Sequence, residues 1–208
     1  MQNDSRYRTI LLFGPPGAGK GTQGKILGSI PGFLHVASGD VFRSLDPASE
    51  LGKIFADYSS RGALVPDDLT VKMWEEHTRN LTTQDTYSPN GELLMLDGIP
   101  RNLNQAQLMD EHIQVLSLVH LGCEDEDAMV ERLSRRALKE NRADDAREEV
   151  VRHRLKVYEQ ETQPLIDHYS PSLVSVVDAL GTPAEVLQGV LKVVVPVQRS
   201  CFPDGVET

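Results

Sequence analysis

Residues 9–23 read TILLFGPPGAGKGTQ, and residues 25–30 continue with a composition compatible with a helix. An apolar strand, a glycine-rich loop and a helix in this order predict a phosphate-binding loop. The glycines permit positive φ values and lack a Cβ, so successive N–H groups can face an oligophosphate, and the positive end of the following helix adds to the attraction. The alternative is a Gly- and Pro-rich turn that only joins a strand to a helix, which the flanking pattern disfavours.

Two side chains of this loop are expected to serve the ligand directly. Lys20 offers a mobile positive charge for the β and γ phosphates, and Thr22 offers a hydroxyl suited to a magnesium ion. Gly21 directly follows the lysine, where the general motif has Ser or Thr, so the hydroxyl is displaced by one position.

The rest of the chain alternates between short apolar runs and segments with helical spacing. This alternation implies crossover connections and therefore an α/β fold with a parallel sheet of five strands, and 208 residues fit one such domain. The five runs lie at residues 9–13, 33–37, 93–96, 116–121 and 173–177. The clearest helix has an apolar stripe at steps of four and three and is expected to end near Pro171. The stripe consists of Val151, Leu155, Tyr158, Thr162 and Leu165.

The composition excludes several other classes of protein. With 39% hydrophobic and 25% charged residues the chain is ordinary for a soluble protein, and no apolar stretch approaches the roughly 18 residues that span a bilayer. The N-terminus lacks an apolar signal core, which predicts a cytoplasmic location. A net charge of −10 disfavours nucleic acids and anionic membranes as partners. Cys123 and Cys201 stand far apart, which indicates neither a disulfide framework nor a zinc site.

Polar side chains follow the second and third apolar runs. Because ligands of open parallel sheets bind beyond the carboxyl ends of the strands, these residues are expected to face one crevice. Asp97 closes the third run at a position suited to hold magnesium, directly or through water, and a helix cap or turn residue is the alternative. Arg43 and Arg101 together predict a second anion site. Seven arginines between residues 132 and 154 are interleaved with acids and, taken alone, favour a solvated helix face.

Four segments together closely resemble the adenylate kinases, and the resemblance covers residues 8–192 in the family's order and spacing. The segments are residues 14–23, 38–43, 94–105 and 132–136. The resemblance implies a single P-loop kinase domain of three layers, and reversible Mg²⁺-dependent phosphoryl transfer from ATP to AMP that gives two ADP. The implied core comprises residues 8–37, 68–132 and 146–195, with a nucleoside-monophosphate-binding insertion at 38–67 and a short lid at 133–145. Residues 196–208 are expected to form a mobile tail.

The resemblance also assigns residues to each substrate. The ATP-binding residues would be Gly14, Pro15, Pro16, Gly17, Ala18, Gly19, Lys20, Gly21, Thr22, Arg132 and Gly181. The AMP-binding residues would be Ser38, Gly39, Arg43, Leu64, Val65, Gly98, Arg101, Gln105, Arg142 and Arg154. The catalytic residues would be Lys20, Arg101, Arg136, Arg142 and Arg154, and Asp97 and Thr22 would hold Mg²⁺ with the nucleotide. The short lid implies that no zinc is bound.

Two other functions stay open at this point. A UMP/CMP kinase shares the fold and nearly all phosphate contacts, but that branch has Asn in place of Gln105 and Ala in place of Ser38. A catalytically silent nucleotide sensor could keep the fold, and the retention of Lys20, Asp97 and the arginines disfavours it. The expected partners are therefore ATP, AMP and ADP, bound by a monomer.

Two positions depart from the family pattern. One residue more than the usual spacing separates Arg142 from Arg154, near Arg147, which predicts a displaced helix start or lid hinge. Ile99 stands where an aromatic residue is common, and we expect this change to affect packing more than chemistry.

Overall fold

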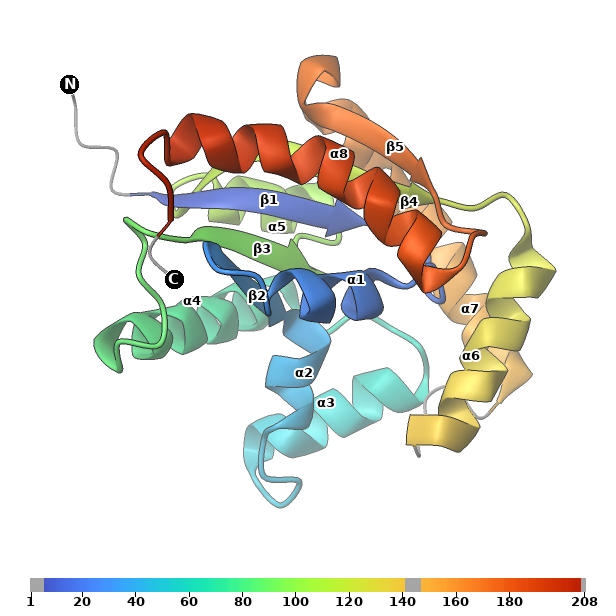
Figure 1. The fold of residues 1–208 in the computed structure, drawn as a ribbon. Coiled ribbons are helices and arrows are strands. Elements are labelled where there is room, and N and C mark those ends of the chain that lie inside the picture. The colour runs from blue at the N-terminus through green and yellow to red at the C-terminus, as the bar shows by residue number, and fades with distance from the viewer. Residues whose placement is uncertain (1–5, 141–146, 207–208) are drawn as a thin grey trace.

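Five parallel strands form the sheet at the centre of the protein (Figure 1). The computed structural model describes residues 6–140 and 147–206. The strands are β1 (Tyr7–Phe13), β2 (Phe33–Ala37), β3 (Leu93–Asp97), β4 (Ile113–Gly122) and β5 (Val174–Asp178). Their order is β2-β3-β1-β4-β5, and every neighbouring pair is parallel, which confirms the predicted fold class and its five strands. Leu12 pairs with Asp97, so the glycine loop and the end of β3 are neighbours.

Helices cover both faces of the sheet, because its central strands are apolar on both sides. Successive side chains of a strand point to opposite faces of the sheet. Along β1, Ile10 and Leu12 therefore face one layer of helices, whereas Leu11 and Phe13 face the other layer. The first layer contains α1 (Lys20–Leu27), α6 (Glu126–Glu140) and α8 (Pro183–Cys201), and the second contains α4 (Asp67–Thr83) and α5 (Leu103–Met109) (Figure 1). In the described part of the chain, none of the helices combines the length and apolar character needed to cross a bilayer.

Two further helices, α2 (Ser38–Arg43) and α3 (Glu50–Ser60), project from the sheet below α1 in Figure 1. They have a small apolar cluster of their own, in which the ring of Phe42 stacks on that of Phe55 with centroids 5.3 Å apart. Ser49 caps α3 by accepting a hydrogen bond from the backbone N–H of Gly52. This projection lies within the residues expected to form the monophosphate-binding insertion.

The helix predicted around residues 151–165 is present, but its hydrogen bonding is irregular. An α-helix, α7 (Glu148–Val157), passes into a π-helical turn, η2 (Tyr158–Thr162), and then into a 3-10 segment, η3 (Gln163–His168). All five residues of the predicted stripe are buried. The expectation of one regular helix up to Pro171 is wrong, because Pro164 has no N–H to continue the α-helical ladder and its ring crowds the preceding turn.

The C-terminal helix is longer than expected. α8 begins with a capping box between Thr182 and Glu185 and continues through Pro196 to Cys201, so the tail predicted from residue 196 is wrong for residues 196–201. Arg8 of β1 ties down the end of this helix. Its guanidinium donates to the carbonyl oxygen of Cys201 at 3.3 Å and lies over the Phe202 ring, 4.5 Å from the centroid.

Candidate active site

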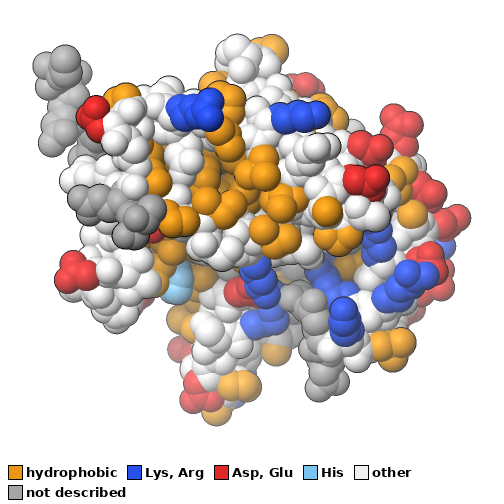
Figure 2. Space-filling model, viewed as in Figure 1, with side chains coloured by type: hydrophobic (Ala, Val, Ile, Leu, Met, Phe, Trp, Pro, Cys, Tyr) orange, Lys and Arg blue, Asp and Glu red, His pale blue; other side chains and the backbone are white. Residues whose placement is uncertain are grey.

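A cavity of about 580 Å³ opens beyond the carboxyl ends of β1, β2 and β3. Lys and Arg side chains gather around the hollow between the α2–α3 projection and α6 (Figure 2). The residues of the predicted site that line it are Gly14, Pro16, Gly17, Ala18, Gly19, Lys20, Gly21, Thr22, Ser38, Gly39, Arg43, Leu64, Val65, Asp97, Gly98, Arg101, Gln105, Arg132, Arg136, Arg154 and Gly181. Pro15 is not among the lining residues, and Arg142 lies outside the described residues.

Two positions of the glycine loop, Gly14 and Gly17, require glycine for steric reasons. Gly14 has φ 146° and Gly17 has φ 91°, in the region that L side chains rarely adopt. A Cβ on Gly14 would lie 2.5 Å from the carbonyl oxygen of Leu121, and one on Gly17 would lie 3.0 Å from that of Met129. The loop therefore packs directly against the end of β4 and the start of α6.

Lys20, the first residue of α1, folds back onto its own loop. Its Nζ donates to the carbonyl oxygens of Gly14 at 2.6 Å and Pro15 at 3.1 Å. Burial lowers the pKa of Lys20 to about 8; Asp97 opposes this change, whereas Arg101, Arg136 and Arg154 add to it. Three guanidinium groups and one carboxylate thus act on the ammonium, and a bound phosphate would add negative charge beside it.

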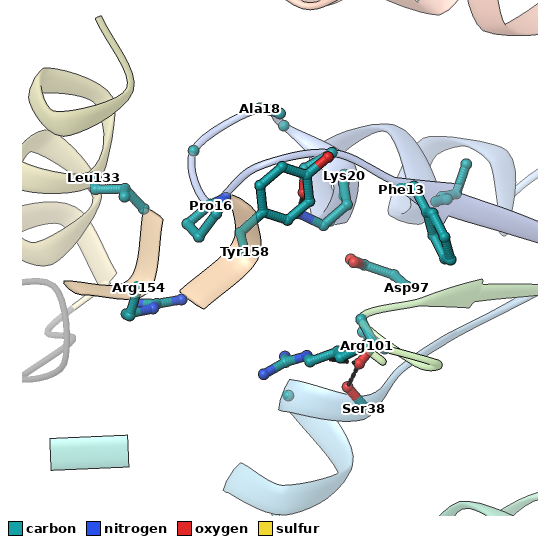
Figure 3. Close-up of a pocket in the computed structure, with 18 of the residues that line it drawn as sticks. Phe13, Pro16, Ala18, Lys20, Ser38, Asp97, Arg101, Leu133, Arg154 and Tyr158 are labelled. Carbon is teal, nitrogen blue, oxygen red and sulfur yellow. Dashed lines mark hydrogen bonds between the residues drawn. The ribbon is translucent and has the colours of Figure 1, made fainter. Parts of the chain in front are cut away.

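The arginines crowd one another across the cavity. Arg101 lies in the loop after β3 and Arg154 lies in α7, and their side chains point toward each other (Figure 3). Burial, together with the nearby charges of Arg154 and Arg43, lowers the Arg101 pKa to about 10 against the opposing effect of Asp97. A bound anion would reduce the mutual repulsion of these like charges, and the arrangement is typical of a polyphosphate site.

Backbone and side-chain contacts fix Arg101 in this position. Its Nε donates to the carbonyl oxygen of Gly98 at 2.8 Å, an oxygen that also accepts from the Ser38 hydroxyl at 2.7 Å (Figure 3). The Thr162 hydroxyl donates to the carbonyl oxygen of Arg101 at 2.7 Å. Thr162 belongs to the π-helical turn, and its sequence signal was that of a core position, so sequence reasoning missed its contact with the site.

Asp97 provides a carboxylate beside the loop. It is 9% exposed, and its Oδ2 lies 3.5 Å from where a Cβ on Gly21 would stand, which is an ordinary van der Waals distance. Within residues 6–140 and 147–206 no group of three or more His, Cys, Asp or Glu could hold a metal ion. One carboxylate with a nearby hydroxyl on Thr22 suits Mg²⁺, which takes its other ligands from phosphate oxygens and water.

A buried histidine stands behind Asp97 and was not identified from the sequence. The Nε2 atom of His35 lies 3.8 Å from Oδ2 of Asp97. It occupies a slot in α1, because a Cβ on Gly24 would lie 2.2 Å from Nε2 and one on Gly28 would lie 2.9 Å from its Cβ. These two glycines therefore give the histidine room to reach the carboxylate.

The side of the cavity toward α5 contains an amide network. Gln105 is 1% exposed; its Oε1 accepts from the backbone N–H of Arg101 at 2.8 Å, and its Nε2 donates to Asp67 at 2.8 Å. Asp67 was missed by sequence reasoning, because an acid in the first turn of a helix is ordinary. Arg43 donates to the Asp40 carboxylate at 2.5 Å, so in this structure it is paired within its own helix.

The opposite side of the cavity is closed by the turn after β5. Arg132 of α6 donates to the carbonyl oxygens of Ala179 at 2.7 Å and Leu180 at 3.3 Å. This pairing places the turn, and with it Gly181, beside the glycine loop. A nucleotide base could lie against this turn while its phosphates occupy the loop.

Residues 133–140, the first part of the expected lid, continue α6, and residues 141–145 lie outside the described part. Arg147, where the chain has its extra residue, precedes α7. Its Nη2 donates to the carbonyl oxygen of Ser60 at 2.6 Å, which joins the start of α7 to the end of α3. This contact joins α7 to the segment expected to form the monophosphate-binding insertion.

Comparison with known proteins shows the family of this chain. A family model described as adenylate kinase matches residues 12–173. The adenylate kinase of Thermobifida fusca (strain YX) is 41% identical over 189 residues, which cover 86% of this chain and 94% of that protein. That of Rhodococcus erythropolis is 41% identical over 186 residues, with coverage of 85% and 93%, and that of Synechococcus sp. (strain RCC307) is 44% identical over 165 residues, with coverage of 77% and 83%. Because it matches this family model and these relatives along most of its length, the chain belongs to the adenylate kinase family.

Proposed function

We propose that this protein catalyses the reversible transfer of the γ-phosphoryl group from Mg²⁺-bound ATP to AMP, which gives two ADP. One observation carries the proposal: a single cavity joins the glycine loop to the pocket between α2 and α5. The loop suits the phosphates of ATP, whereas Ser38, Arg43 and Gln105 suit a nucleoside monophosphate. The cations that line this cavity lie between the two pockets, where phosphoryl groups would meet.

The chemistry requires charge neutralisation and alignment more than a base. Two polyanions must approach with the attacking and leaving oxygens in line, and the acceptor phosphate is already ionised near neutral pH. Accordingly, the described residues that line the cavity include no histidine. Lys20, Arg101 and Arg154 would hold the transferring group, with Arg136 and Arg142 completing the set.

Asp97 and the Thr22 hydroxyl would hold Mg²⁺ together with the nucleotide. When bound, the ion would offset the negative charge of the β and γ phosphates. His35 would keep the Asp97 carboxylate turned toward the loop.

Water exclusion would come from movement of the insertion, residues 38–67, and the lid, residues 133–145. Closure around both substrates would place the phosphates in a dry cavity and limit transfer to water. We also propose that the protein works as a monomer in the cytoplasm, as its sequence predicts, without nucleic-acid or membrane partners.

A coupled assay for ADP formation from ATP and AMP tests the proposal. AMP should exceed UMP and CMP by orders of magnitude in kcat/KM, because a site built to hydrogen-bond one base leaves buried polar groups unpaired with another. Equal use of CMP would support a pyrimidine nucleotide kinase instead.

The two-pocket arrangement has its own test. Two adenosines joined by five phosphates should bind about 10² to 10⁴ times more tightly than ATP, since linking makes the second binding event intramolecular. Calorimetry measures this directly, with ATP and AMP as controls. An affinity no better than that of ATP would mean that the pockets do not converge, and phosphoryl transfer would have to be abandoned for simple nucleotide binding.

A further inference from the structure

Asp67 holds Gln105 by a hydrogen-bond network, although it is not among the residues that line the cavity. Its Oδ1 accepts from Nε2 of Gln105 at 2.8 Å and from Nδ2 of Asn102 at 2.9 Å. Its Oδ2 accepts from Nδ2 of Asn104 at 2.8 Å. Burial would raise the Asp67 pKa, but the three amide donors outweigh it and lower the pKa below its ordinary value, so the group is an ionised acceptor near neutral pH.

The partners of Gln105 leave one orientation for its amide. An ionised carboxylate can only accept hydrogen bonds, so the NH₂ group must face Asp67. A backbone N–H can only donate, so the carbonyl oxygen must face Arg101. Asn102 cannot turn to compensate, because its Oδ1 accepts from the backbone N–H of Gln105 at 2.9 Å and caps α5.

We propose that Asp67 is a positioning residue for base selection: it fixes the Gln105 amide so that its remaining N–H and lone pair read the 6-amino edge of a purine. This inference rests on the proposed function, in which Gln105 meets the base of AMP. Adenine offers an acceptor at N1 and a donor at its 6-amino group, which match one N–H and one carbonyl lone pair. Hypoxanthine, with N1–H and a 6-oxo group, has the opposite polarity at both atoms and nearly the same shape.

The test compares the affinities for AMP and for inosine monophosphate (IMP), measured by calorimetry, together with kcat and KM in the coupled assay. Asp67→Ala removes the acceptor and should lower the AMP-to-IMP affinity ratio roughly tenfold, because one charged partner of the amide is lost. KM for AMP should rise, whereas KM for ATP should stay close to that of the unmodified protein.

Two matched variants separate orientation from charge. Asp68→Ala removes the same charge from the same helical turn at an exposed position, and its AMP-to-IMP ratio should not change. Asp67→Asn loses the charge but keeps one acceptor oxygen for Gln105, while its NH₂ group faces Asn104, whose exposed amide can turn to present its oxygen, so most of the discrimination should return. An unchanged ratio in Asp67→Ala, or an equal fall in Asp68→Ala, would overturn the inference.

A double-mutant cycle shows whether Asp67 acts through Gln105. In a Gln105→Ala background, Asp67→Ala should have no further effect on the ratio. If Asp67→Ala does not fold, hydrogen exchange of the Gln105 side-chain amide in the unmodified protein provides the test. Slow exchange, as expected for an amide bound by both Asp67 and Arg101, supports the inference. Exchange as fast as that of exposed glutamines refutes it. If the unmodified protein makes no ADP from AMP, the proposed function itself fails, whereas ADP formation with unaltered ratios refutes only the role of Asp67.

Discussion

Replacing Lys20 with Met should remove a pH dependence of stability that the unliganded protein has above about pH 8. Burial lowers the Lys20 pKa from 10.5 to about 8. In the unfolded chain the pKa returns to its ordinary value, so above pH 8 the unfolded state holds more protons than the folded state. The free energy of unfolding contributed by this group therefore rises with pH, by roughly 2 kcal/mol between about pH 7 and pH 9.5.

Urea denaturation of both proteins at intervals over this pH range measures the effect. Burial raises the pKa values of Tyr87, Tyr158 and Tyr169, which lowers stability at high pH, but both proteins contain these tyrosines. The difference between the two proteins therefore isolates Lys20. Phosphate and sulfate buffers must be avoided, because an anion bound to the loop would stabilise the folded state and restore the lysine charge. If the stability of the two proteins changed equally with pH between about pH 7 and pH 9.5, folding would not lower the pKa of Lys20, and the reasoning would be refuted.

Three further predictions concern the site and its surroundings. Lys20→Met should keep the fold and lose about 10² to 10⁴ in turnover in the coupled assay, and near-normal turnover would exclude the lysine from the reaction. Gly14→Ala should lower the free energy of unfolding by about 1–3 kcal/mol and weaken ATP binding in calorimetry, because its Cβ would meet the Leu121 carbonyl oxygen. Gly205→Ala is the control, since Gly205 also has positive φ but no atom within 4 Å of its Cβ position, and an equal loss there would mean that backbone strain alone is responsible. Arg152→Ala should leave the urea midpoint nearly unchanged although it faces three carboxylates, because solvent screens exposed ion pairs, and a large shift would contradict this.

The fold could be predicted almost completely because its signals are local. The apolar run at 33–37 coincides with β2, and the run at 93–96 misses only the last residue of β3. β4 extends beyond the predicted 116–121 at both ends, because Gln114 interrupts the apolar pattern there and Gly122 ends it, whereas backbone pairing continues through both. The π-helical turn escaped prediction because a buried stripe has nearly the same spacing in either kind of helix.

The site could be predicted as a set of residues but not as a set of interactions. The order of strands places Asp97 beside the loop, and the strand-end rule is enough to bring it there. The hydrogen bonds of Lys20 to its own loop and of Arg43 to Asp40 depend on which acceptors the folded chain places nearest to each charge. The contact between Asp67 and Gln105 joins residues 38 positions apart, which no local pattern in one sequence can indicate.

The positive cavity lies on a protein whose net charge is −10, and this contrast has a consequence for the kinetics of nucleotide capture. Only within about one Debye length, roughly 10 Å at 0.1 M salt, does an approaching nucleotide meet both the repulsion of the acidic surface and, near the mouth, the attraction of Lys20 and the arginines. Added salt weakens both forces, so its effects on the association rate partly cancel. Salt should therefore act mainly by speeding nucleotide release, and stopped-flow measurements should find the dissociation rate to be the more salt-dependent of the two.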